Sequence, residues 1–361
     1  MPEKKLYSLP KAKVPGLIAA LLKSKHRVWG PVQGEHGDTF LNELSSAKDL
    51  CRDYVNGFLG AKRYVFPQLE EMFRFRKTGA GLTLSPPPPQ QPTVVWGLRS
   101  CDMSAVLYFD SFFGRGAKSG SNWKAGDPLP DPLYVARREA AVFVSIACNT
   151  AGPKCFCVCT DSGPFLSKGY DVQLTDLGSH YLAETGTAKG EQFVAGHRQF
   201  FGAGREDDMK KRRALEVQAE KTFQEPVSFF AKAMRKLDRG AVKPAFWQKV
   251  ASYCIGCGGC IYACPMCSCF DVDDVKISGT EGARVRSWDT CDFAGFTREV
   301  SGHNPRATRA DRRQRWFYHK LSMDYLEKNP VIGCVGCGRC VITCPGGVDM
   351  ATVVRWMRKV E

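Results

Sequence analysis

Eight of the seventeen cysteines in this chain fall into two strings that share the spacing C-x2-C-x2-C-x3-C-P. The first string runs from Cys254 to Pro265, and the second runs from Cys334 to Pro345. In this spacing, three closely spaced thiolates bind one [4Fe–4S] cluster and the fourth cysteine binds its neighbour. The pattern therefore predicts two iron–sulfur clusters that exchange one ligand between the strings.

The crossed arrangement assigns four cysteines to each cluster. The ligands predicted for the first cluster are Cys254, Cys257, Cys260 and Cys344. The ligands predicted for the second cluster are Cys334, Cys337, Cys340 and Cys264. Glycines in both strings permit the positive φ angles of a tight ligand loop. Zinc sites use two C-x2-C pairs without a fourth Cys-Pro, and a disulfide framework fits the spacing less well, so both are weaker interpretations.

A third group of cysteines follows a predicted strand–helix–strand unit. Residues 92–99 and 140–147 are expected to form buried strands, and residues 103–113 a helix between them. Cysteines at the carboxyl ends of such strands meet at one edge of the sheet. The ligands predicted for a third [4Fe–4S] cluster are Cys101, Cys148, Cys155 and Cys157. Open alternatives are Cys159 in place of Cys157, a zinc site, and cysteines without a ligand role.

The remaining cysteines carry weaker signals. Cys51 is expected to be a small core residue. Cys267 and Cys269 follow the first string so closely that each could contact a cluster or replace a ligand, and the spacing assigns no role to Cys291.

The chain has 361 residues, which is enough for two domains. Its net charge of +14 shows an excess of cationic side chains. Anionic clusters require nearby cations, and the basic stretch from Arg306 to Arg315 either neutralises them, docks a partner or forms a solvated helix face. No nucleic-acid recognition module is present. We find neither a signal peptide nor an apolar run long enough to cross a membrane, and reduced thiols suit the cytoplasm.

The predicted architecture is an α/β domain with a mostly parallel sheet (residues 1–240), followed by a helical, bacterial-type two-cluster ferredoxin domain (residues 241–361). The latter contains an insertion at about residues 270–330. Residues 1–84 are expected to be helix and loop, with helices at 15–25 and 42–58. Strands are expected at 170–174 and 180–184. A charged helical segment at 205–239, split at Pro226, bridges the domains, and a helix at 244–253 leads to Cys254.

The quoted motifs together resemble a family of iron–sulfur subunits, typified by the iron–sulfur subunit of anaerobic sulfite reductase and the sulfhydrogenase beta subunit, with related subunits in flavin oxidoreductase–heterodisulfide reductase complexes. The resemblance also rests on Gly97 to Asp102, Trp288 to Cys291 and Gly302 to Arg306. It implies a partner flavoprotein that binds FAD and NAD(P)H, and it supports the third cluster. The run after Cys157 departs from the family pattern, which leaves the fourth ligand open between Cys157 and Cys159.

No flavin, nicotinamide or nucleotide-phosphate fingerprint occurs in the sequence context that it would require, so we expect neither a flavin nor a nicotinamide on this chain. The sequence thus predicts an electron-transfer subunit that connects the flavoprotein with a terminal reductase, a hydrogenase or a heterodisulfide reductase module, or with ferredoxin. Two alternatives are a catalytic reductase that uses the Cys101 group and a basic cluster-containing nucleic-acid-binding protein.

Overall fold

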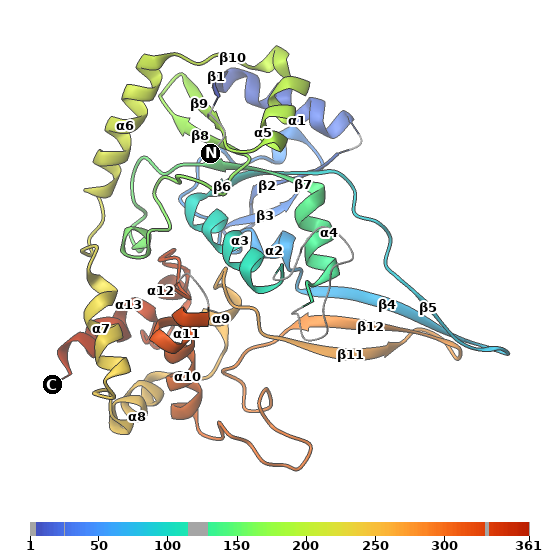
Figure 1. Cartoon of the computed structure of the whole chain (residues 1–361), viewed down its shortest axis with the longest axis vertical. Coiled ribbons are helices and arrows are strands. Elements are labelled where there is room, and N and C mark those ends of the chain that lie inside the picture. The colour runs from blue at the N-terminus through green and yellow to red at the C-terminus, as the bar shows by residue number, and fades with distance from the viewer. Residues whose placement is uncertain (1–4, 25, 115–128, 329–331, 361) are drawn as a thin grey trace.

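The computed structural model describes residues 5–24, 26–114, 129–328 and 332–360. Its largest element is an eight-stranded sheet with the order β10-β1-β9-β8-β7-β6-β2-β3 (Figure 1). The strands of this sheet are β1 (Leu6–Pro10), β2 (Arg27–Gln33), β3 (Thr39–Glu43), β6 (Thr93–Arg99), β7 (Ala141–Ile146), β8 (Val172–Asp176), β9 (His180–Thr185) and β10 (Gly202–Ala203).

The sheet is mixed, so the prediction of a mostly parallel sheet was wrong. Only the pairs β2–β6, β6–β7 and β7–β8 are parallel. The pairs β2–β3, β8–β9, β9–β1 and β1–β10 are antiparallel. The physical reason is that short turns join β2 to β3 and β8 to β9, and a short connection forces neighbouring strands to run in opposite directions.

Helices cover both faces of this sheet. Alternation along β6 sends Val94 and Trp96 into a core with α1 (Val14–Lys23) and α5 (Ala188–Gly196). Val95 points the other way, into a core with α2 (Lys62–Val65), α3 (Ser100–Phe112) and α4 (Pro132–Ala140). The predicted strand–helix–strand unit is therefore confirmed as β6, α3 and β7, buried from both sides.

The N-terminal third differs most from its prediction. It contains strands β1 to β3, as well as β4 (Leu69–Thr78) and β5 (Gly81–Ser85), where helix and loop were expected. The helix expected at 42–58 is absent from these described residues, because their backbone bonds to neighbouring strands: the Cys51 N–H donates to Pro31 O (2.8 Å) and the Phe58 N–H to Thr39 O (2.7 Å). Cys51 is half-buried rather than in the core. The first expected helix is α1; Lys25 lies outside the described residues.

Several other predicted elements are confirmed. β8 and β9 occupy the two expected strand segments, and the charged segment forms α6 (Glu206–Glu220) and α7 (Phe229–Asp238) on either side of Pro226. The helix expected before Cys254 is α8 (Pro244–Tyr253). Figure 1 shows α6 running down one side of the molecule from the sheet to the C-terminal helices, as a bridging helix would.

The C-terminal part is mainly helical. Its helices are α7, α8, α9 (Gly259–Tyr262), α10 (Arg309–Leu321), α11 (Met323–Lys328), α12 (Arg339–Thr343) and α13 (Met350–Lys359). Their shared core includes Phe229, Trp247, Phe317 and Val353. In the described ranges, we find no helix with both the length and the apolar character that crossing a membrane would require.

A second sheet joins the two halves of the chain. Its order is β11-β12-β4-β5, with β11 (Phe270–Lys276) and β12 (Glu281–Trp288) contributed by the segment between the two cysteine strings. β12 pairs antiparallel with β4, and the sheet extends away from the body as a long arm (Figure 1). The predicted insertion thus adds strands to a sheet begun in the N-terminal half.

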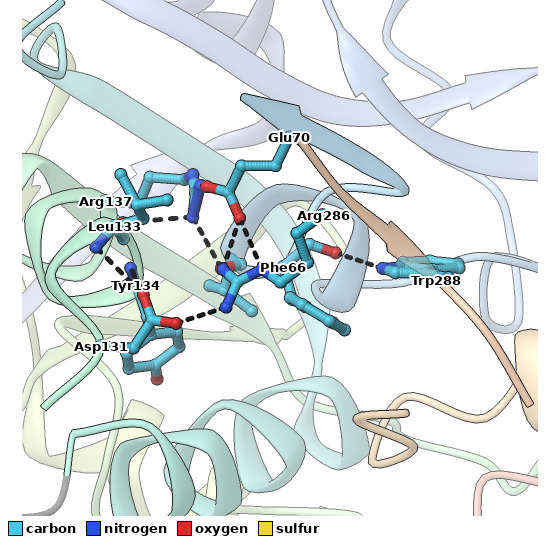
Figure 2. Close-up of polar contacts among 9 residues, drawn as sticks. Phe66, Glu70, Asp131, Leu133, Tyr134, Arg137, Arg286 and Trp288 are labelled. Carbon is cyan, nitrogen blue, oxygen red and sulfur yellow. Dashed lines mark hydrogen bonds and ion pairs between the residues drawn. The ribbon is translucent and has the colours of Figure 1, made fainter. Parts of the chain in front are cut away.

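A buried ion network secures this junction. Glu70 of β4 pairs with Arg286 of β12 and with Arg137 of α4, and Arg286 also pairs with Asp131 (Figure 2). Glu70 and both arginines are at most 7% exposed. Beside them, the Trp288 indole donates to Phe66 O at 2.8 Å. Glu70 therefore contacts two nearly buried guanidinium groups, of which Arg286 alone has a second carboxylate partner in Asp131.

Replacing Glu70 by Gln would remove the carboxylate that pairs with Arg137 and leave Arg286 with Asp131, and removing one partner of a buried ion pair strands the other charge. We expect the free energy of unfolding to fall by about 3–5 kcal/mol. Urea denaturation of the anaerobically purified chain measures it. The matched control is Glu71→Gln, whose carboxylate pairs with the exposed Arg74 and should matter by less than about 1 kcal/mol. Equal effects of the two substitutions would contradict the network's role.

Candidate metal centres

Both cysteine strings fold into the same local shape. In each, two glycines adopt left-handed backbone conformations, Gly256 and Gly258 in the first string and Gly336 and Gly338 in the second. A short helix then carries the third cysteine, α9 for Cys260 and α12 for Cys340. The glycine pattern read from the sequence therefore serves the positive φ angles that were expected.

The four cysteines predicted for the first cluster line one cavity. Cys254, Cys257, Cys260 and Cys344 surround an empty volume of about 300 Å³, together with Asp292 and Arg313. The cavity brings the fourth cysteine of the second string to the first three of the first string, as the crossed arrangement requires. A cavity lined by four thiols and one guanidinium group suits an anionic iron–sulfur cluster.

Cations of α10 lie against the first string, and one of them, Arg313, lines the cavity. The Arg313 guanidinium, 1% exposed, donates to Cys260 Sγ at 3.5 Å and to Val348 O at 3.1 Å. Arg309 donates to Cys254 O, and Arg312 to Asp292 O at 2.8 Å. Part of the basic stretch is therefore internal and lies against the first string.

The cysteines predicted for the second cluster also converge. Cys264 lies within electrostatic range of Cys334 and Cys337, and Cys340 within range of both. The ammonium group of Lys320 donates to Cys264 Sγ at 3.4 Å and to Gly333 O at 2.7 Å. Burial raises the pKa of Cys334 to about 12, which favours the neutral thiol in the absence of a metal.

The third predicted group gathers at the carboxyl ends of β6 and β7. Cys101 lies in the first turn of α3, and Cys148 follows β7. Cys148, Cys155 and Cys157 lie within electrostatic range of one another, and Cys101 within range of Cys157. Burial is the main cause that raises the pKa of each of these thiols.

Cys159 points away from this group. Its thiol donates to Pro226 O at 3.2 Å, at the junction between α6 and α7. The geometry thus favours Cys157 over Cys159 as the fourth member of the set.

The second string and the third group are in direct backbone contact. The Phe156 N–H donates to Gly336 O at 2.7 Å, and Asn56 donates to Cys337 O at 2.7 Å. Arg339, which precedes Cys340, forms a buried ion pair with Asp102, which follows Cys101 (2.9 Å). Two loops of predicted ligands are therefore joined to each other.

Among the described residues, no three His, Cys, Asp or Glu side chains gather around one point as ligands of a single ion would. Sequence reasoning assigned no definite role to Cys267, Cys269 or Cys291, yet these three line a further cavity with Lys320. It also missed Lys62, which is 4% exposed with its ammonium group 3.7 Å from the centre of the Trp288 ring. No spacing rule signals Lys62, because tertiary folding alone buries it.

The contact between the two loops predicts different effects for equivalent glycines. A Cβ on Gly336 would lie 2.4 Å from Phe156 O, whereas a Cβ on Gly256, at the same place in the first string, has no atom closer than 3.7 Å. Both substitutions to Ala incur the left-handed strain of about 1–2 kcal/mol. We therefore expect Gly336→Ala to lower the urea-unfolding midpoint and the iron content clearly more than Gly256→Ala. Matching losses in the two variants would contradict the close contact.

The comparisons with known proteins agree with this geometry. Residues 253–348 match the family model described as a 4Fe-4S dicluster domain. Over 340 residues, the chain is 29% identical to sulfhydrogenase 2 subunit beta of Pyrococcus furiosus, and the alignment covers 94% of each protein. The resemblance predicted from the motifs is thereby confirmed: the chain is similar to the sulfhydrogenase beta subunit, and the dicluster match supports an iron–sulfur subunit.

Proposed function

We propose that this chain relays electrons between the subunits of an oxidoreductase complex, through clusters held by the two strings and by the group of Cys101, Cys148, Cys155 and Cys157. The observation that carries the proposal is the contact between Gly336 and Phe156, which joins the second string to the third group. The exchanged cysteines Cys344 and Cys264 link the first string to the second. The second string therefore neighbours both the first string and the third group.

When bound, each cluster supplies a site that gains or loses one electron. The residues of this chain hold the thiolates in place, keep water out and set the local charge. Phe156, Trp247 and Phe317 are at most 2% exposed and belong to the core that packs around the cysteines. Arg313 and Lys320 donate to cysteine sulfurs, and such hydrogen bonds stabilise the more negative, reduced state.

The first string reaches the protein surface. Cys257 is exposed, and Tyr253 and Ile255 beside it are 52% and 64% exposed. By contrast, Cys101 and Cys157 of the third group are buried. We therefore propose that a partner exchanges electrons at the exposed end, where apolar side chains surround the loop.

The proposed partners follow from the family. The relative's name places it in a sulfhydrogenase, so we propose a hydrogenase or reductase module for this chain, or a heterodisulfide reductase module. A flavoprotein with FAD and NAD(P)H, or ferredoxin, would supply or take the electrons. The cytoplasm is the proposed compartment, since its reducing conditions suit cysteine-ligated clusters. Burial of Arg312 and Arg313 removes cations that a nucleic-acid surface would need.

The electron-relay proposal predicts a chain that stores electrons but converts no substrate by itself. Anaerobically purified protein should contain iron and acid-labile sulfide and give EPR signals after reduction. It should reduce neither sulfite nor protons until partner subunits are added. Turnover by the isolated chain would support the catalytic alternative instead. Zinc in place of iron would overturn the proposal.

The exchange of ligands predicts reciprocal effects of two serine variants. Cys264→Ser should weaken or abolish the EPR signal of the second string's cluster, and Cys344→Ser that of the first, because each cysteine serves the other string. Spectra of Cys254→Ser and Cys334→Ser identify the two signals. If each variant instead loses the signal of its own string, the crossed ligand set is wrong.

A further inference from the structure

A cavity separate from the first string's is also lined by cysteines. Cys267, Cys269 and Cys291 surround an empty volume of about 300 Å³, the same as that of the cavity lined by Cys254, Cys257, Cys260 and Cys344. Cys267 and Cys291 are each 7% exposed. Three thiols therefore line one cavity, as the four thiols predicted for the first cluster do.

The segment between the strings builds this cavity from three parts of its length. Cys267 and Cys269 follow the first string, and β11 begins at Phe270. Pairing of Phe270 with Trp288, continued by the Asp289 N–H bond to Cys269 O (3.1 Å), brings Cys291 back beside them. Helix α10 closes the cavity with Trp316, His319 and Lys320.

Buried cations accompany these thiols. Lys320 is 5% exposed, and Lys62 is 4% exposed. Cys267 and Cys269 lie within electrostatic range of both ammonium groups. Arg313 occupies the corresponding position at the first string, where it donates to Cys260 Sγ. Two buried cations favour an anionic group in the cavity.

The thiols lie in contact with one another. The Cys291 thiol donates a hydrogen bond to Cys269 Sγ. The Cys267 thiol donates in the same way to Cys264, a predicted ligand of the second cluster. The cavity is therefore adjacent to the second cluster's site.

A nitrogen ligand completes the set. His319 lines this cavity and an adjoining open one, which Cys269, Cys291, Arg306 and Arg315 also line. Burial, followed by the charges of Lys320, Arg315 and Arg306, lowers the pKa of His319 to about 4. Its imidazole is therefore neutral and can donate a lone pair.

We propose that Cys267, Cys269, Cys291 and His319 bind an additional [4Fe–4S] cluster beside Cys264. The cations that face it, Lys62 and Lys320, offset its negative charge. The side chains of Tyr108, Trp316 and Tyr325 line the cavity on its other sides. A Cys3His set also suits zinc, but among the described residues no three His, Cys, Asp or Glu side chains gather closely enough around one point to bind a single ion.

The test is metal content in single-cysteine variants of the full chain, purified without oxygen. Cys269→Ser and Cys291→Ser should each lower the iron content by about four atoms per chain, with matching loss of acid-labile sulfide. The matched control is Cys51→Ser, whose half-buried thiol donates to Asp53 O and should leave the iron content unchanged. Unchanged iron in both test variants overturns the proposal, and so does a loss of zinc instead of iron.

A second measurement needs no substitution and decides the matter if those variants fail to fold. Pulsed EPR of the reduced wild-type chain, grown with 15N-labelled histidine, should show a nitrogen coupling that changes with the isotope. Absence of that coupling overturns the assignment of His319.

Failure of this inference can be told from failure of the electron-relay proposal. If the signals of the two strings are present while Cys269→Ser and Cys291→Ser leave iron unchanged, only the additional site is wrong. If the wild-type chain contains no iron, both are wrong.

Discussion

The buried ion pair between Asp102 and Arg339 is the contact on which the arrangement of the thiol groups depends. It joins the first turn of α3, which carries Cys101, to α12, which carries Cys340. Both side chains are at most 4% exposed, and Arg339 also donates to Gly57 O at 2.6 Å. An unpaired charge in such a place would cost several kcal/mol, so the two helices must stay together. The ion pair therefore fixes the position of the third group relative to the second string.

The need of a buried charge for a partner of opposite sign also bears on the positive charge of the chain. Arg313 lies at the first string, Lys320 at Cys264, and Arg339 between the second string and Cys101. Each is at most 5% exposed, and each lies within reach of a cysteine sulfur. A lone buried cation is unfavourable, and so is a buried anionic cluster, but together they compensate each other. Part of the net charge of +14 therefore lies inside the protein beside cysteine sulfurs and not on a surface for an acidic partner.

Sequence alone could predict what depends on local spacing. The strings, their glycines and α8 follow from short-range patterns, and the α3 unit follows from the apolar strands on either side of it. The strands of the N-terminal third were missed because their partners are distant: β1 pairs with β9, and β4 with β12. For the same reason the cavity of Cys267, Cys269 and Cys291 could not be predicted, since pairing of β11 with β12 is what brings Cys291 back. The mixed sheet was mistaken for a parallel one because only its centre has the strand–helix–strand pattern.

The segment between the strings is accordingly more than a spacer. Its hairpin anchors the helical part to the N-terminal half through Glu70 and Arg286, and its helix α10 supplies both Arg313 and Lys320. Two strings alone would supply the thiolates but neither the cations nor the attachment to the large sheet. Because β12 ends at Trp288, directly before Cys291, the strand that anchors the two halves also delivers a thiol to the additional cavity. Anchoring, charge compensation and ligand supply thus come from one stretch of chain, so a change in the register between β4 and β12 would disturb all three.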